Sequence, residues 1–362
     1  MKDLLAKWYL SHSNIKHWSA AFVFEVYFRL YILCNPGKIK GCRAVAENIS
    51  RRIPDRSVLS IQLDILFMFF CLGFYAREYQ AHHFEEKKLG ERIKYYSNFN
   101  MIIFNKCFND QKLANEYYAD KSKTYELFKD YFRRDALKIT SEDDYMVFCE
   151  FSKKHPRFFC KELSGIGGHN ACFLQVDDGH DAVEIFHEIL LKGKCIIEEP
   201  ILQHHEMNRL NDSSVNTVRL VTFITREGKI DYLSALVRIG RKGQSVDNAS
   251  SGGKLCRLNI DSGKIDSPAY SYQGDRENVN PDNGIVYMGF QIPFWLEILR
   301  MAHELASKML RIRYSSWDFA LTEDGPVLVE VNHDGGIGIH QIANQYGFRQ
   351  RIRELVNHER GG

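Results

Sequence analysis

The stretch SSWDFALTEDGPVLVEVN, residues 315–332, decides the fold, because it predicts two β-strands joined by a tight turn at Asp324-Gly325. A turn of these two residues would place Asp318 opposite Val331. A turn of three residues that ends at Gly325, with this glycine left-handed, places Asp318 opposite Glu330 instead. The position of the glycine favours the second register.

Three polar side chains interrupt this otherwise apolar hairpin. Glu330 and Asn332 lie two residues apart on one strand and therefore share a face. In the favoured register Asp318 joins them, with opposed Cβ atoms about 5 Å apart. Two carboxylates this close repel each other unless a cation lies between them, and an all-oxygen ligand set suits Mg²⁺ or Mn²⁺ rather than zinc. The alternative is an edge strand that turns its polar side to water.

Composition describes a folded protein without a strong charge. The chain has 362 residues, enough for two domains or one elaborated domain, with 44% hydrophobic and 26% charged residues. A net charge of +2 gives no electrostatic reason for nucleic acid to be the main partner. The nine cysteines are scattered without paired metal-binding spacing, which indicates reduced thiols in the cytoplasm.

The N-terminal part of the chain is predicted to be neither a signal peptide nor a membrane span. Charges and histidines occupy the first 18 residues, where a signal peptide needs an apolar core. The most apolar run, residues 58–76, contains Asp64, and its uninterrupted part is too short to cross a bilayer, so we expect a buried helix. A second interpretation is attachment at the inner face of the membrane through the aromatic and basic residues Trp8, Tyr9, Lys16, His17 and Trp18.

The pattern along the chain predicts an α+β fold. Residues 1 to about 110 are typical of helices, including a long segment at 83–108. From about residue 150 strands alternate with helices, and antiparallel hairpins such as the one over 214–240 dominate the C-terminal half.

A glycine-rich segment, CKELSGIGGHN at 160–170, is a candidate phosphate loop. Lys161 ends a strand, and the loop of Ser164, Gly165, Gly167 and Gly168 allows backbone amides to approach phosphate oxygens. A second strand follows rather than a helix, so the segment is neither a Walker A motif nor a Rossmann fingerprint. It fits a flap over a triphosphate; an ordinary glycine-rich hairpin is the alternative.

Two further segments contain polar residues that could serve a nucleotide. IIEEPILQHHE, residues 196–206, could be a hinge along an adenine ring, with Glu206 accepting from ribose hydroxyls; a strand that leaves the sheet into a polar loop explains it equally well. In VNTVRLVTF and ALVRIG, Arg219 and Arg238 stand among apolar residues on strands. Buried guanidinium groups need anions, either an anionic substrate or transferring phosphoryl group, or neighbouring acids in salt bridges.

Taken in order, the lysine before the glycine-rich loop, the acidic hinge, NTVRLVT, DNASSGGKL and the final Asp, Glu and Asn resemble the ATP-grasp superfamily. Within it, the chain is most similar to the sugar-transfer-associated branch, from about Asp110 to Phe348, and GFYAREY also resembles that branch. The resemblance implies two α+β subdomains whose antiparallel sheets sandwich ATP, after a helical region. The implied limits are 1–110 for the helical region, 111–200 for the first subdomain and 201–362 for the second.

The resemblance also implies a role for particular residues. Asp318, Glu330 and Asn332 match the magnesium ligands, with Glu330 as the bridge between two ions. The remaining positions fall at the phosphate lysine (Lys161), the mobile loop (Gly165, Gly167, Gly168), the adenine hinge (Glu198, Glu199, Ile201), the ribose contact (Glu206), an upstream lysine (Lys121 or Lys123) and the phosphoryl-stabilising groups (Arg219, Arg238, Asn248).

The implied activity is that of an ATP-dependent carboxylate–amine ligase, which forms an amide through an acyl phosphate with ATP and Mg²⁺. The branch suggests a sugar acid or cell-surface polysaccharide precursor as the carboxylate, and an amino acid or other amine as the acceptor. The alternatives are a kinase-like phosphotransferase and a non-catalytic nucleotide-binding scaffold of polysaccharide assembly. The chain departs from many relatives in its helical N-terminal region and in NHDGGIGIHQ, where a Pro-Gly pair is common; both departures concern the acceptor.

Overall fold

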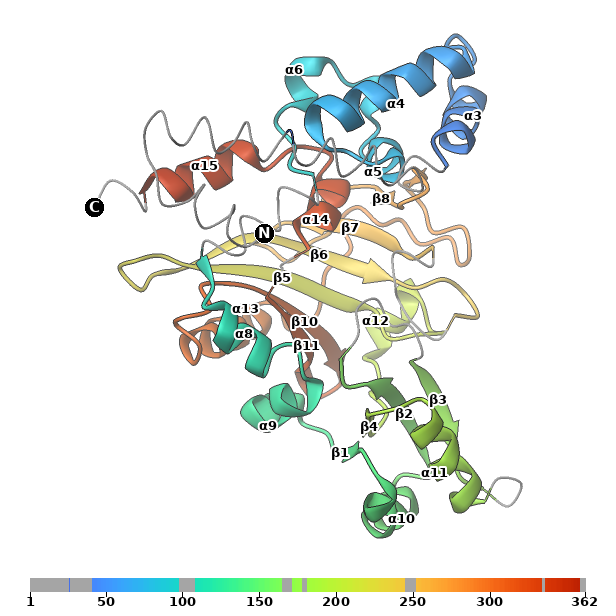
Figure 1. Cartoon of the computed structure of the whole chain (residues 1–362), viewed down its shortest axis with the longest axis vertical. Helices are drawn as coiled ribbons and strands as arrows, with labels where there is room; N and C mark the ends of the chain where they lie inside the picture. The colour runs from blue at the N-terminus through green and yellow to red at the C-terminus, as the bar shows by residue number, and fades with distance from the viewer. Residues whose placement is uncertain are drawn as a thin grey trace. The chain divides into compact units, whose positions relative to one another are not determined.

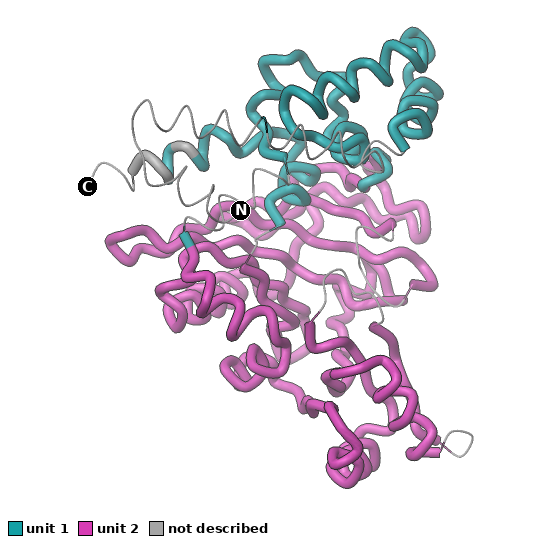
Figure 2. The backbone as a smooth tube through the Cα atoms, viewed as in Figure 1, with its two compact units in different colours: residues 1–108, 272–275, 336–362 teal, residues 109–271, 276–335 magenta. Residues whose placement is uncertain are grey.

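The computed structural model describes residue 26 and residues 41–97, 108–164, 171–177, 181–244, 252–333 and 336–358. Predicted loop residues Gly165, Gly167 and Gly168, the predicted phosphoryl contact Asn248, and the aromatic and basic residues at 8–18 lie outside these ranges. The chain forms two compact units (Figure 2). Unit 1 comprises 1–108, 272–275 and 336–362, and unit 2 comprises 109–271 and 276–335. The last 27 residues thus group with the N-terminal region, whereas the sequence assigned them to the second subdomain.

Unit 1 is helical in its described part, as predicted. Its elements are α3 (Cys42–Arg52), α4 (Val58–Leu72), α5 (Ala76–Ala81), the 3₁₀ helix η2 (Phe84–Glu86), α6 (Leu89–Arg92), α14 (Ile337–Asn344) and α15 (Arg349–His358). The long helix expected at 83–108 is wrong: His83 has a left-handed φ of 51°, and only the short η2 and α6 follow it in the described residues.

Helix α4 corrects a second expectation. Ser57 caps its start by accepting from the Ser60 amide, and left-handed Gly73 ends it. One face is buried through Ile61, Ile65 and Met68, but Leu59, Leu63 and Phe67 on the other are exposed, so the helix is only half buried. Among the described residues, none of the helices combines the length and apolar character needed to cross a bilayer.

Unit 2 contains two antiparallel sheets (Figure 1). After α8 (Gln111–Tyr117) and α9 (Lys121–Phe132), the smaller sheet has the order β1 (Ala136–Ile139), β4 (Cys195–Glu198), β2 (Arg157–Glu162) and β3 (Cys172–Gln175). Helices α10 (Tyr145–Lys154) and α11 (Ala182–Leu191) bury Phe148 and Phe186 with Phe158 and Ile197 of this sheet. The alternation of apolar and polar residues along these strands leaves the other face available to a site.

The larger sheet carries the predicted hairpin. Its order is β11 (Gly325–Asn332), β10 (Tyr314–Thr322), β5 (Thr217–Ile224), β6 (Ile230–Ile239), β7 (Lys254–Leu258), β8 (Ala269–Tyr270) and β9 (Arg276–Glu277). Helix α12 (His205–Leu210) precedes β5, and α13 (Trp295–Ser307) packs against the sheet. Trp317, Leu220 and Val218 share one core cluster with α13 residues Ile298 and Leu305. β11 lies at one edge of this sheet.

The expected pairing of Asp318 with Glu330 is confirmed, but the expected turn is wrong. The turn has two residues, because Thr322 pairs with Gly325. The register then shifts by one between Asp318 and Phe319, so that Val329 is an extra residue on β11. This β-bulge, rather than a longer turn, brings Asp318 opposite Glu330. Gly325 has the expected positive φ, at 108°.

Candidate functional site

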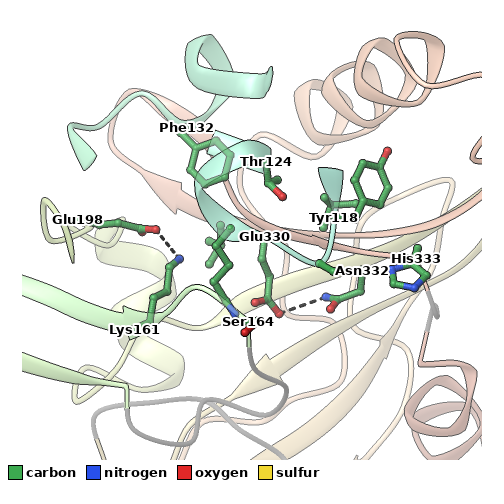
Figure 3. Close-up of a pocket in the computed structure, with 13 residues that line it drawn as sticks. Tyr118, Thr124, Phe132, Lys161, Ser164, Glu198, Glu330, Asn332 and His333 are labelled. Atoms are coloured by element: carbon green, nitrogen blue, oxygen red, sulfur yellow. Dashed lines mark hydrogen bonds and ion pairs between the residues drawn. The ribbon is translucent and has the colours of Figure 1, made fainter. Parts of the chain in front are cut away.

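A cavity of about 250 Å³ lies in unit 2 between α9, the ends of β2 and β4, and the edge strand β11 (Figure 3). We call it the β11 cavity. Its lining residues are Tyr118, Ala119, Lys121, Thr124, Phe132, Lys161, Ser164, Glu198, Val329, Glu330, Val331, Asn332 and His333. The start of α9 is fixed there by Asp120, whose carboxylate caps the helix, and by the Lys121 amide, which donates to the Leu163 carbonyl at 3.1 Å.

Two of the three predicted metal ligands line this cavity. The Asn332 side-chain amide donates to Glu330 Oε1 at 3.2 Å, so the amide oxygen is the atom that Asn332 can offer a cation. A carboxylate and an amide oxygen together suit Mg²⁺, which takes its other ligands from water and phosphate. The donor chemistry of Glu330 and Asn332 therefore fits a magnesium ion.

Asp318 is the third predicted ligand, and it is occupied by arginines. The Arg219 Nε and Nη2 atoms each lie 2.5 Å from one carboxylate oxygen, and Arg238 Nη2 lies 3.1 Å from Oδ2. Asp318 is fully buried and does not line the cavity. Burial alone would raise the pKa of Asp318, but the charges of Arg219 and Arg238 outweigh it and hold the pKa below its ordinary value.

Arg219 is buried as predicted, whereas Arg238 is half-buried, and both lie against neighbouring acids. Arg219 also lies 3.5 Å from Glu330 Oε1, so it links both acids of the pair. Arg238 donates from Nε to the Thr217 hydroxyl at 2.8 Å. The acids thus hold both guanidinium groups in fixed positions on the sheet.

Lys161 belongs to a second buried ion cluster. Its ammonium lies 2.5 Å from Glu198 Oε1, and Arg134 Nη2 lies 2.6 Å from Glu198 Oε2. Burial acts to raise the pKa of Glu198, but Arg134 and Lys161 together lower it. Glu198 was predicted at the adenine hinge. Its side chain instead pairs with Lys161 at the wall of the cavity.

The sequence left open whether Lys121 or Lys123 is the upstream lysine, and the structure places these two residues differently. Lys121 is half buried and lines the β11 cavity, whereas Lys123 is exposed and does not. Burial lowers the pKa of Lys121; Glu330 opposes this effect and the charge of Lys161 adds to it. Of the two candidates, Lys121 is therefore the one that lies at the cavity, and its contact with phosphate stays a prediction.

The other predicted hinge and ribose residues lie away from the cavity lining. The Glu199 carboxylate accepts from the Asp135 amide at 3.1 Å, and Glu206 pairs with Arg209 at 2.5 Å. Ile201 is half buried in the loop before α12. Their roles stay predictions.

Sequence reasoning missed Arg134, Tyr118 and the bulge residue Val329. Arg134 follows Arg133 in YFRRDALKI, and the sequence shows no difference between an exposed and a buried arginine there. Val329 stands in the alternating segment VLVEV, which predicts a regular strand. A bulge without glycine leaves no composition signal.

The chain belongs to the family described as sugar-transfer-associated ATP-grasp, which it matches over residues 103–357. This match confirms the expected ATP-grasp fold preceded by a helical region. No curated protein matches the chain.

Solved structures resemble the chain only distantly. D-alanyl-alanine synthetase A from Vibrio cholerae O1 biovar eltor is 14% identical with a TM-score of 0.42, covering 69% of this chain and 66% of its own. D-alanine–D-alanine ligase from Bacillus anthracis is 13% identical with a TM-score of 0.41, covering 69% and 71%. L-amino acid ligase from Bacillus licheniformis is 12% identical with a TM-score of 0.38, covering 63% and 43%. The chain thus spans about two thirds or less of the length of two of these three proteins.

Proposed function

We propose that the protein is an ATP-dependent ligase that joins a carboxylate to an amine. The observation that carries this proposal is the β11 cavity, where two lysines meet a carboxylate and an amide oxygen in a chain of an ATP-grasp family. A triphosphate with bound magnesium needs positive charges near its phosphate oxygens and oxygen ligands for the ion, and both kinds of group lie at this cavity.

The chain's own residues would divide the work as follows. Lys121 and Lys161 would bind phosphate oxygens, and Glu330 and Asn332 would hold Mg²⁺ when it is bound. The ion would neutralise charge on the β- and γ-phosphates. A second ion would need Asp318 as a ligand, and this carboxylate becomes available only if Arg219 and Arg238 exchange it for phosphoryl oxygens.

The proposed reaction has two steps. A carboxylate oxygen of the substrate attacks the γ-phosphorus of ATP, and the bond to the bridging oxygen breaks to release ADP and leave an acyl phosphate. The amine nitrogen then attacks the acyl carbon, phosphate leaves, and the nitrogen loses a proton to give the amide. Arg219 and Arg238 would stabilise the negative charge that develops on the phosphoryl group.

The substrate class is proposed from the family's association with sugar transfer: a sugar acid or cell-surface polysaccharide precursor, joined to an amino acid or other amine. We place the protein in the cytoplasm, with peripheral attachment to the inner face of the membrane through the N-terminal segment. Sedimentation with anionic lipid vesicles tests this attachment, and protein that stays in the supernatant at low salt contradicts it.

The ligase proposal is tested with purified protein, Mg²⁺, ATP and panels of carboxylates and amines, by measuring ADP and product mass. We expect ADP release that needs both substrates and yields an amide. A stable phosphate ester would indicate a kinase-like enzyme instead, and nucleotide binding without ADP release would indicate a scaffold. Glu330→Gln should abolish turnover; unchanged turnover would contradict the assigned metal site.

A further inference from the structure

Arg134 lies between α9 and β1, where the two sheets of unit 2 come together, and it belongs to none of the sequence motifs. Its side chain is almost completely buried, with 4% of its surface exposed. A guanidinium group cannot lose its charge in a protein, so a buried one must find acceptors for its N–H groups. The identity of those acceptors therefore shows what Arg134 holds in place.

The acceptors of Arg134 lie on both sides of the β11 cavity. Nε and Nη2 donate to Glu198 Oε2 at 3.0 and 2.6 Å, on β4 of the smaller sheet. Nη1 donates to the Leu328 carbonyl at 2.7 Å, on β11 of the larger sheet, and to the Phe132 carbonyl at 3.2 Å. One rigid, planar group thus joins the two sheets.

The contacts with Glu198 and Leu328 each lead to a predicted site residue, the phosphate-binding Lys161 and the metal ligand Glu330. Glu198 holds the Lys161 ammonium with its other carboxylate oxygen, at 2.5 Å. Leu328 is the residue before the bulge at Val329, and Glu330 follows that bulge. Because a bulge bends its strand locally, a bond to the carbonyl beside it constrains the direction in which the next side chain points.

We infer that Arg134 is a positioning residue that sets the phosphate lysine and the magnesium ligand relative to each other. Through Glu198 it fixes Lys161, and through the Leu328 carbonyl it fixes the bulge that presents Glu330. Arg134 itself does not line the cavity, so its effect passes entirely through these neighbours. The inference rests on the proposed function only in taking magnesium–ATP as the ligand.

The test uses the full-length protein and the variant Arg134→Lys, with Arg133→Lys as matched control. Lysine keeps the charge beside Glu198 but lacks the planar fork that reaches both sheets. Arg133 is the adjacent arginine, exposed, with one 3.4 Å bond to the Asp324 carbonyl. Three quantities are measured: the thermal midpoint, the Kd of a fluorescent ATP analogue, and the Mg²⁺ concentration that gives half-maximal analogue binding.

We expect Arg134→Lys to fold, to weaken analogue binding about tenfold, and to raise the Mg²⁺ midpoint. Arg133→Lys should leave all three quantities at wild-type values. A folded Arg134→Lys protein with wild-type affinity and a wild-type Mg²⁺ midpoint would overturn the inference, because a purely structural role changes only the thermal midpoint.

A second variant covers the case in which Arg134→Lys does not fold. Arg134→Met combined with Glu198→Gln removes the buried Arg134–Glu198 pair as a whole, so Arg134 is not left without its carboxylate; Lys161 loses the same partner in the double variant and in Glu198→Gln alone. We expect this double variant to match Glu198→Gln alone in analogue affinity, since both act through Lys161, but to need more Mg²⁺ than Glu198→Gln. Equal Mg²⁺ midpoints would overturn the Leu328 contact as a positioning device.

The measurements separate this inference from the ligase proposal. A wild-type protein that binds the analogue with Mg²⁺ but never releases ADP contradicts the ligase and still gives the affinities that test Arg134. A wild-type protein that does not bind the analogue overturns both.

Discussion

Asp318 and Arg219 form a bidentate ion pair in the middle of the larger sheet, with both N–O distances at 2.5 Å. The two residues are 99 positions apart in the sequence and directly opposed on β10 and β5. Arg238 adds a second positive charge to the same carboxylate. Asp318, which was predicted as a metal ligand, therefore holds the side chains of Arg219 and Arg238 in place.

The first prediction concerns this buried pair. Asp318→Asn keeps the shape of the side chain but leaves the buried guanidinium group of Arg219 and the half-buried one of Arg238 facing a neutral amide. We expect a loss of about 3–5 kcal/mol in the free energy of unfolding, measured by urea denaturation. Asp324→Asn in the exposed turn of the same hairpin is the control and should stay within about 0.5 kcal/mol of wild type. A small loss for Asp318→Asn would mean that the arginines have other anions.

The second prediction separates Lys121 from Lys123. Lys121→Met removes a positive charge from the cavity wall and should weaken the binding of an ATP analogue about tenfold or more. Lys123→Met, two residues away on the exposed side of α9, should leave affinity within about twofold. Isothermal titration measures both, and equal effects would contradict the assignment of Lys121.

The third prediction concerns pH. Neighbouring positive charges lower the pKa of both Asp318 and Glu198 in the folded protein. Their ionised forms therefore contribute stability above the unfolded-state pKa, and that contribution is lost as the pH falls through the folded-state pKa. We expect the free energy of unfolding to decline below about pH 4.5, and Glu198→Gln to flatten this decline. A wild-type curve that is level down to pH 3 would be incompatible with these shifts.

The fourth prediction concerns the turn of the β10–β11 hairpin. Gly325 has a φ of 108°, and a Cβ there would lie 3.3 Å from Glu297 Oε2. Gly325→Ala should cost more than about 1 kcal/mol in the free energy of unfolding. Gly228→Ala provides the comparison, since its φ of 82° is also positive but the space around it is open. If the two variants lose the same stability, the contact with Glu297 adds nothing.

Local pattern predicted the hairpins, the α+β class and the pairing of Asp318 with Glu330. It predicted that pairing through the wrong turn, because a bulge formed by Val329 depends on contacts with other strands and not on local composition. The buried state of Arg219 followed from its apolar neighbours, but its partner could not, since acids and phosphates satisfy a guanidinium equally well. Arg134 could not be distinguished from Arg133, because burial at the end of a helix depends on what packs there.

The bulge has a consequence for the edge of the larger sheet. Without the shift, the register set by the turn would place Val329 opposite Asp318 and Val331 opposite Ser316; with it, Glu330 and Asn332 take these places. One extra residue in this outermost strand thus decides whether two valines or an acid and an amide of β11 stand opposite β10.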